Sequence, residues 1–130
     1  MMEPLFVHPD IAEAQTLPAA YYTAEHYFRE TLARIFSPLW LYVGDAANLT
    51  VPGAVEPFTW LPGYGNEPLL LTNDSGTLRC LSNVCTHRAN LLVTQPCQLH
   101  HIRCGYHGRQ FSLAGQLLHM PEFKEVRNFP

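Results

Sequence analysis

Two short steps from a cysteine to a histidine constrain this chain more than any other feature. One residue separates Cys85 from His87, two separate Cys104 from His107, and sixteen residues lie between the two steps. Two thiolates and two imidazoles can hold one zinc ion in a closed tetrahedral site. They can also hold a [2Fe-2S] cluster in which two histidines replace two cysteines on one iron. Either site requires a fold that brings two separate loops together.

The order of the ligands favours the cluster. Zinc fingers and ribbons commonly take their ligands as Cys-Cys and His-His pairs, each closing a small ring on one ion. Here each step supplies one cysteine and one histidine. In a cluster with both cysteines on one iron and both histidines on the other, each loop gives one ligand to each iron. A structural zinc module remains the alternative.

Length and composition narrow the class of protein. The chain has 130 residues, enough for one domain with a real core, and is 47% apolar and 15% charged. Its net charge of -3 provides no basic excess for a nucleic acid. No apolar run approaches the roughly 18 residues of a membrane span, and no secretory signal is visible at the start. We therefore expect a cytoplasmic protein, where thiols stay reduced and clustered cysteines often bind metal.

The patterning divides the chain at residue 38. Residues 1–38 are expected to form an arm and one helix, capped by Thr23, running through 24–36 and ending at Ser37-Pro38. Residues 39–130 read as strands. These comprise LWLYV at 39–43, AVEPFTWL at 54–61, a hairpin of 67–72 with 77–84 around NDSG, and a second hairpin around Ala114-Gly115. Alternation in the 77–84 strand predicts that Cys80 is a small core residue. Both Cys-His steps fall at strand ends.

The wider context of the steps resembles a known family. NVCTHRAN and CGYHGRQFSLAG resemble the two cluster loops of bacterial Rieske non-haem iron oxygenases, the ring-hydroxylating dioxygenase α-subunit family. Residues 17–58 resemble the start of those subunits. The resemblance implies a mainly β, Rieske-type small antiparallel β-sandwich or barrel with a cluster-binding subdomain of two loops, preceded by one N-terminal helix. It implies a Rieske [2Fe-2S] cluster on the following ligands: Cys85, His87, Cys104 and His107. It places these residues around the ligands: Arg88, Gly105, Tyr106 and Gly108.

Two positions depart from the usual family pattern. Ala89 stands where the family has glycine, at a cost of about 1 kcal/mol if that position requires a positive φ. Arg109 stands where many members carry tryptophan. Respiratory Rieske proteins have a disulfide at the positions of Asn90 and Tyr106 and a serine at that of Arg109, so the resemblance implies the low-potential branch. Fewer hydrogen bonds to the sulfurs predict a potential near about −150 mV.

The function implied by the resemblance is electron relay. A reductase or ferredoxin would donate single electrons, and the acceptor would be the mononuclear Fe(II) of an oxygenase catalytic domain, in a neighbouring subunit of a trimer. That domain is expected to lie outside these 130 residues, so the fragment alone should not turn over substrate. A free-standing Rieske ferredoxin is the alternative. The residues do not decide between an aromatic substrate and a quaternary amine.

Overall fold

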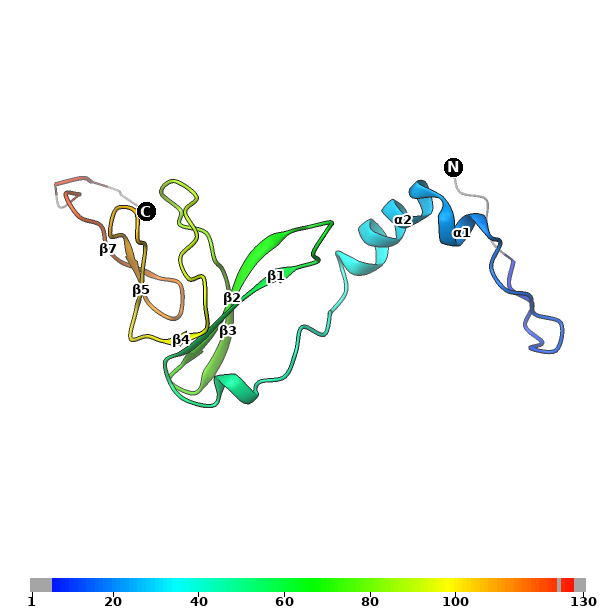
Figure 1. Cartoon of the computed structure of the whole chain (residues 1–130), viewed down its shortest axis with the longest axis horizontal. Helices are drawn as coiled ribbons and strands as arrows, with labels where there is room; N and C mark the ends of the chain where they lie inside the picture. The colour runs from blue at the N-terminus through cyan, green and yellow to red at the C-terminus, as the bar shows by residue number, and fades with distance from the viewer. Residues whose placement is uncertain (1–5, 124, 128–130) are drawn as a thin grey trace. The chain divides into compact units, whose positions relative to one another are not determined.

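The chain forms two compact units in a computed structural model that describes residues 6–123 and 125–127. The first unit is Met1–Tyr42 and the second is Val43–Pro130 (Figure 1). Each is described by itself below. The domain boundary expected at residue 38 from the sequence remains a prediction.

The first unit is helical. It contains α1 (Ala20–Thr23), α2 (Glu25–Thr31) and a π-helical turn η1 (Leu32–Phe36), which continues α2 up to Ser37. Residues 25–36 are thus helical as expected, but the expected cap is wrong. Thr23 ends α1, and its hydroxyl donates to the carbonyl of Ala19 at 3.2 Å. This backward bond competes with capping of the following helix, which begins after Ala24 without a side-chain cap.

The expected strand at residues 39–43 does not form. These residues have no regular secondary structure. Leu39, Trp40 and Tyr42 are exposed, and Trp40 is wholly so. An apolar run of this composition becomes a strand only when a neighbouring strand takes up its backbone hydrogen bonds. Within the described residues, 39–43 make no such pairing.

The larger sheet of the second unit is built on a long hairpin. Its strands are β1 (Ala54–Trp60), β2 (Glu67–Asp74), β3 (Thr77–Ser82) and β4 (Cys97–Gln98), in the order β3-β2-β1-β4, with every pairing antiparallel. The hairpin predicted at NDSG is confirmed. Ser75 and Gly76 have φ values of 53° and 96°, as a two-residue type I′ turn requires. The Asn73 side chain accepts the amide proton of Gly76 at 2.6 Å.

A smaller sheet carries the second hairpin. Its strands are β5 (Ile102–Arg103), β6 (Gln110–Phe111) and β7 (Leu117–His119), paired antiparallel in that order. The turn around Gly115 is therefore also confirmed. The Thr72 hydroxyl, on β2, donates to the carbonyl of Leu113 at 2.7 Å and ties this hairpin to the larger sheet.

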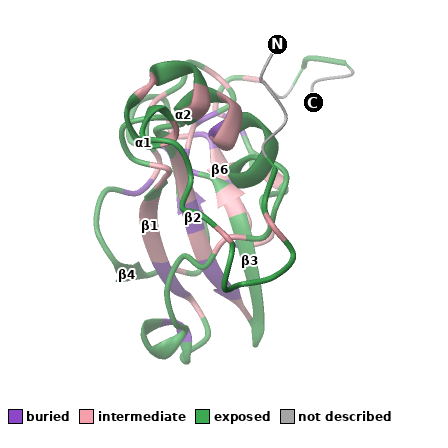
Figure 2. Ribbon diagram, turned by 90° about the vertical axis from the view of Figure 1, so that its right-hand side faces the viewer, coloured by how far each residue is buried: buried purple, intermediate pink, exposed green. Residues whose placement is uncertain are grey.

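The core lies between the two sheets and reaches the predicted ligand loops. It comprises Val55, Leu70, Cys85, Val93, Ile102, Cys104, Phe111 and Leu113. Figure 2 shows that the buried positions of the larger sheet lie on β1 and β2. The expected mainly antiparallel β architecture is confirmed.

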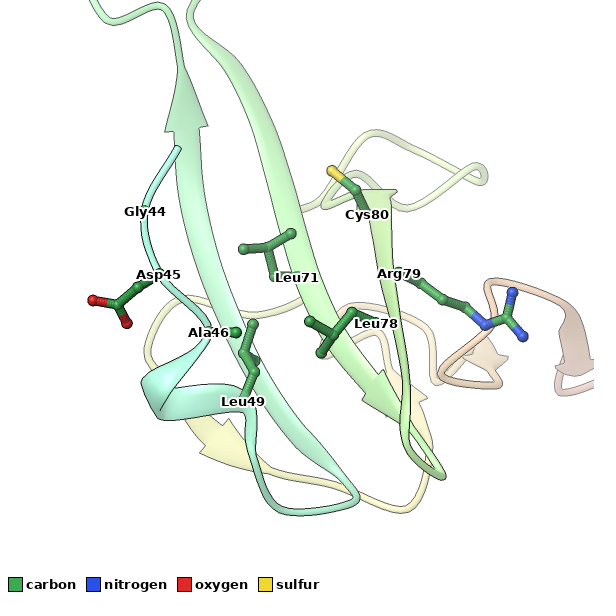
Figure 3. A pocket seen from close by; sticks show the side chains of 8 residues that line it. All are labelled: Gly44, Asp45, Ala46, Leu49, Leu71, Leu78, Arg79 and Cys80. Carbon is green, nitrogen blue, oxygen red and sulfur yellow. The ribbon is translucent and has the colours of Figure 1, made fainter. Parts of the chain in front are cut away.

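The edge strand β3 is exposed over most of its length (Figure 2). The expectation that Cys80 is a core residue is wrong, because alternation along an edge strand does not guarantee that either face is covered. Beside β3 lies a cavity of about 240 Å³. Leu49 from the short helix η2 (Ala47–Leu49) faces Leu71 and Leu78 there, while the guanidinium of Arg79 points away (Figure 3). No predicted ligand lines this cavity.

In the described part of the chain, none of the helices has both the length and the apolar character needed to cross a bilayer.

Candidate metal centre

The two Cys-His steps lie in two loops with the same backbone frame. The first loop is residues 84–91, flanked by the pairing of Val84 with Leu91, and the second is residues 103–110, flanked by the pairing of Arg103 with Gln110. In each loop the cysteine amide donates to the carbonyl five residues later at 2.8 Å. In each, the amide four residues after the cysteine donates back to the cysteine carbonyl at 3.0 Å. Each loop is therefore a hydrogen-bonded hairpin with a cysteine at its base.

The fifth residue counted from the cysteine is left-handed in both loops. Ala89 has a φ of 54° and Gly108 a φ of 74°. A Cβ added at Gly108 would lie 3.3 Å from Cγ of Pro121 and 3.6 Å from a guanidinium nitrogen of Arg103. The positive φ considered for Ala89 is thus present, and it costs about 1 kcal/mol for a residue with a side chain.

The two cysteines are buried next to each other. Cys85 is 2% exposed and Cys104 is 3% exposed, and their side chains are in hydrogen-bond contact. Burial by itself would raise the pKa of Cys104. Backbone amides of Tyr106 and His107 donate to its sulfur, as do the Cys85 thiol and the Asn90 side chain, and together they lower this pKa. The pocket is therefore built to stabilise a thiolate, the form of cysteine that binds metal.

The two histidines form a second pair toward the solvent. Their rings, of His87 and His107, meet edge to face, with centroids 4.9 Å apart and planes at 68°. The Tyr106 ring lies against His107 at 3.8 Å between centroids. Burial lowers the pKa of His87, and the charges of His107, Arg88 and Arg109 lower it further. A neutral imidazole is favoured, which is the state that binds a metal.

The donor set fits a binuclear cluster with mixed ligands. The structure arranges the four predicted ligands as two pairs, one of sulfurs and one of imidazoles. Over residues 6–123 and 125–127, no three His, Cys, Asp or Glu side chains are placed to hold one ion. A Rieske-type [2Fe-2S] group takes its thiolates on one iron and its imidazoles on the other, so two separate pairs are the arrangement it needs.

The residues predicted around the ligands have different environments. Arg88 and Gly105 are exposed, and nothing lies within 4 Å of a Cβ added at Gly105. Tyr106 is 58% exposed. Gly108 is half-buried in its left-handed conformation. Only Gly108 therefore occupies a position at which a side chain would meet both an unfavourable φ and close neighbours.

Two asparagines at the site were not predicted as functional. Asn90 donates from its side chain to the sulfur of Cys104 at 3.8 Å, and so links the first loop to the second. Asn83 is buried at the base of the first loop, where its side chain donates to the carbonyl of Val93 at 2.7 Å and accepts the Val93 amide at 2.9 Å. An asparagine at a strand end, just before a cysteine loop, was the available signal for Asn83.

Comparisons with known proteins agree with this geometry. The sequence profile of the Rieske [2Fe-2S] domain matches residues 40–130. The carnitine monooxygenase oxygenase subunit of Escherichia coli strain K12 is 29% identical over 118 residues, which are 90% of this chain and 31% of that protein. The chloroplastic choline monooxygenase of Spinacia oleracea is 30% identical over 118 residues, which are 89% of this chain and 26% of that protein.

A solved structure shows the same fold. The quaternary ammonium Rieske monooxygenase CntA, in complex with L-carnitine, superposes with a TM-score of 0.79 at 26% identity, covering 90% of this chain and 33% of that one. The chain thus spans about a third or less of the length of these relatives.

Proposed function

The chain belongs to the Rieske [2Fe-2S] domain family, and from this premise we propose that the two cysteines and two histidines of its loops hold the cluster. When bound, such a cluster supplies reversible one-electron chemistry. The observation that carries the proposal is the pairing of the four side chains. Two sulfurs are adjacent in the core, and two imidazoles are adjacent toward the surface.

The cysteine pair and the histidine pair differ in their exposure to solvent. The buried cysteines keep their sulfurs away from water, and hydrogen-bond donors around the Cys104 sulfur lower the pKa of its thiol. His87 is half-buried and His107 exposed, so the imidazole side offers a route to a partner protein. The Tyr106 ring lies against His107, tilted by 31° with centroids 3.8 Å apart.

The function that these features support is electron relay within an oxygenase. A reductase or ferredoxin would supply single electrons, and a mononuclear iron in the catalytic domain, of a neighbouring subunit in a trimer, would receive them. The support is homology, because the relatives are Rieske oxygenase subunits about three times as long as the matched region. A cytoplasmic setting is part of the proposal, and all four cysteines are free thiols in the structure, as that setting favours.

The same relatives support a proposal for the substrate class of the whole enzyme. Two of them are named for carnitine and choline, and the solved one for quaternary ammonium compounds. We therefore assign a quaternary ammonium substrate to the oxygenase of which this domain would be part. The assay is hydroxylation of carnitine and choline by that enzyme, with naphthalene as the aromatic comparison.

The relay is tested by anaerobic stopped-flow absorbance. The cluster-loaded chain is mixed with a low-potential flavin reductase and NADH, and bleaching of the visible bands is followed. We expect bleaching that requires the reductase, followed by full recovery on exposure to oxygen. A chain that dithionite reduces but no reductase does would contradict the relay. Turnover of substrate by the chain alone would also contradict it.

The ligand assignment is tested by replacing one imidazole. His107→Cys puts a thiolate where the imidazole is neutral, so the added negative charge should lower the midpoint potential. His101→Cys, at an exposed histidine outside the loops, is the matched control and should leave the potential unchanged. An intact cluster with an unshifted potential in His107→Cys would show that His107 is not a ligand.

A further inference from the structure

Charge is unevenly distributed along the second unit. Residues 43–74 contain four acidic residues and no lysine or arginine, whereas residues 75–121 contain four arginines and no acidic residue. Both ligand loops lie in the second stretch. Residues 122–130 contain two charges of each sign. The stretch that bears the candidate ligands is therefore basic, although the whole chain has a net charge of -3.

Two of the four arginines are exposed and make no salt bridge within the described residues. Arg79 pairs with Asp74 at 3.0 Å on the edge strand, and Arg109 is only 5% exposed. Arg88 and Arg103 are both exposed, and the salt bridges of the described residues involve neither of them. Their two charges are thus accessible to a partner molecule.

The two exposed arginines adjoin the candidate histidine ligands. Arg88 follows His87 directly in the first loop. In the second loop, the guanidinium nitrogens Nη2 and Nε of Arg103 lie 3.6 and 3.7 Å from a Cβ built at Gly108, which follows His107. The two histidine rings have centroids 4.9 Å apart. Each loop therefore contributes one exposed guanidinium near the imidazole pair.

An exposed aromatic ring accompanies these charges. Tyr106 is 58% exposed, and its ring lies against that of His107 with centroids 3.8 Å apart. Tyrosine and arginine are the residues that are enriched where proteins bind one another. A surface that binds nucleic acid needs a larger basic excess, because it must neutralise several phosphates. The composition of this surface therefore favours a protein partner.

We propose that Arg88, Arg103 and Tyr106 form a docking surface for the electron donor, and that this donor is a protein with an acidic surface around its redox centre. The inference rests on the proposed function and adds the charge of the partner. Opposite charges steer two proteins toward each other and raise their association rate. The acidic stretch 43–74 would repel the same partner, so the uneven charge also favours one orientation of approach.

The test uses two forms of one donor. The probe is a strongly acidic plant-type [2Fe-2S] ferredoxin, whose potential lies below that of a Rieske centre; its control is the same ferredoxin with its surface carboxylates amidated. The reduced probe is mixed with the oxidised, cluster-loaded chain in a stopped-flow instrument. The ferredoxin is oxidised by one electron, the cluster is reduced by one, and no proton moves.

The rate constants of the two forms should differ only at low salt. We expect the acidic ferredoxin to react about tenfold faster than the amidated one at about 50 mM salt. The two rate constants should converge at about 1 M salt, where the Debye length is about 3 Å. Equal rate constants for the two forms at low salt would overturn the proposal.

Substitutions locate the charges that matter. Arg88→Gln and Arg103→Gln should each lower the low-salt rate constant for the acidic ferredoxin about threefold, and the double variant about tenfold. Lysine at both positions keeps the charge and should stay within about twofold of the wild type. Arg79→Gln is the matched control, because it changes the net charge equally at an arginine that is already paired. An equal loss in Arg79→Gln would overturn the proposal, since net charge alone would then explain the rates.

A binding titration gives a readout that needs no electron transfer. Calorimetry with the oxidised acidic ferredoxin should show a Kd about tenfold higher for the double glutamine variant than for the wild type. A duplex DNA of about 20 base pairs is the competing polyanion; tighter binding of the DNA than of the ferredoxin would overturn the proposal. Failure of the proposed function has a different signature, because the wild-type chain would give no cluster signal, while the titration would still decide the docking surface.

Discussion

The two ligand loops share a backbone frame and differ in what the frame presents. Both are closed by the same pair of hydrogen bonds, and both turn through a left-handed residue. Counted from the cysteine, the histidine is the third residue in the first loop and the fourth in the second, yet the two rings meet. The loop frame is therefore set by backbone hydrogen bonding, while the ligand positions are set by a one-residue offset within it.

The loops differ again at the sixth residue counted from the cysteine. Asn90 of the first loop reaches across to the sulfur of Cys104, whereas Arg109 of the second is packed over the core. One loop thus supplies a neutral donor to the ligand sulfur, and the other supplies a buried charge. Four substitutions test this difference between the loops.

The largest effect, a loss of cluster binding, is expected from a substitution at the base of the second loop. Cys104→Ser should abolish cluster binding, because a hydroxyl is a poor ligand for iron in such clusters compared with a thiolate. Iron content and visible absorbance per chain measure the loss. Cys80→Ser, at an exposed thiol on β3, is the control and should bind iron like the wild type. Equal iron in the two variants would contradict the site.

The side chain of Asn83 braces the base of the first loop. Asn83→Ala should destabilise the chain by about 3 kcal/mol, because it leaves the buried amide and carbonyl of Val93 without their side-chain partner. Urea unfolding of the metal-free chain measures this. Asn48→Ala, at an exposed position, should change the free energy of unfolding by less than about 0.5 kcal/mol. Similar losses in both variants would mean that Asn83 does not brace the loop.

In the second loop, stability should depend on glycine at position 108 and not at position 105. Gly108→Ala should destabilise by about 2 kcal/mol, since it combines a positive φ with a Cβ 3.3 Å from Pro121. Gly105→Ala meets open space and should be nearly neutral. Thermal melts of both variants provide the comparison, and a larger loss at Gly105 would reverse our description of the loop.

The smallest expected effect is a gain in stability. Ala89→Gly should stabilise the first loop by up to about 1 kcal/mol, because glycine adopts a φ of 54° without strain. Ala114→Gly, where φ is not positive, should destabilise slightly through chain entropy. A loss of stability in Ala89→Gly, measured by urea unfolding, would contradict a strained alanine at this position.

Local sequence patterns predicted much of this fold. The incorrect predictions concern features that depend on tertiary packing. The NDSG hairpin needs only turn chemistry, and the four proposed ligands were identified from spacing and flanking residues. Thr23 failed as a cap because a second helix before it takes its hydroxyl. Residues 39–43 and Cys80 failed because strand propensity does not reveal whether a neighbour covers the strand.

The side chains around the ligands were the hardest part to predict. Arginine is normally an exposed residue, so nothing in the local sequence indicated that Arg109 is buried. The bond from Asn90 to Cys104 joins residues of different loops, and it exists only once those loops have packed. Such second-layer contacts depend on the whole fold, whereas the ligands themselves form a compact sequence pattern.

We propose that the two loops together hold one [2Fe-2S] cluster. The most direct measurement is EPR of the dithionite-reduced chain after anaerobic reconstitution, with iron and zinc analysis of the same sample. We predict a rhombic signal with the low average g-value of a Rieske centre and about two irons per chain. A silent spectrum with one zinc per chain and no iron would rule out the cluster and assign the four residues to a structural zinc site.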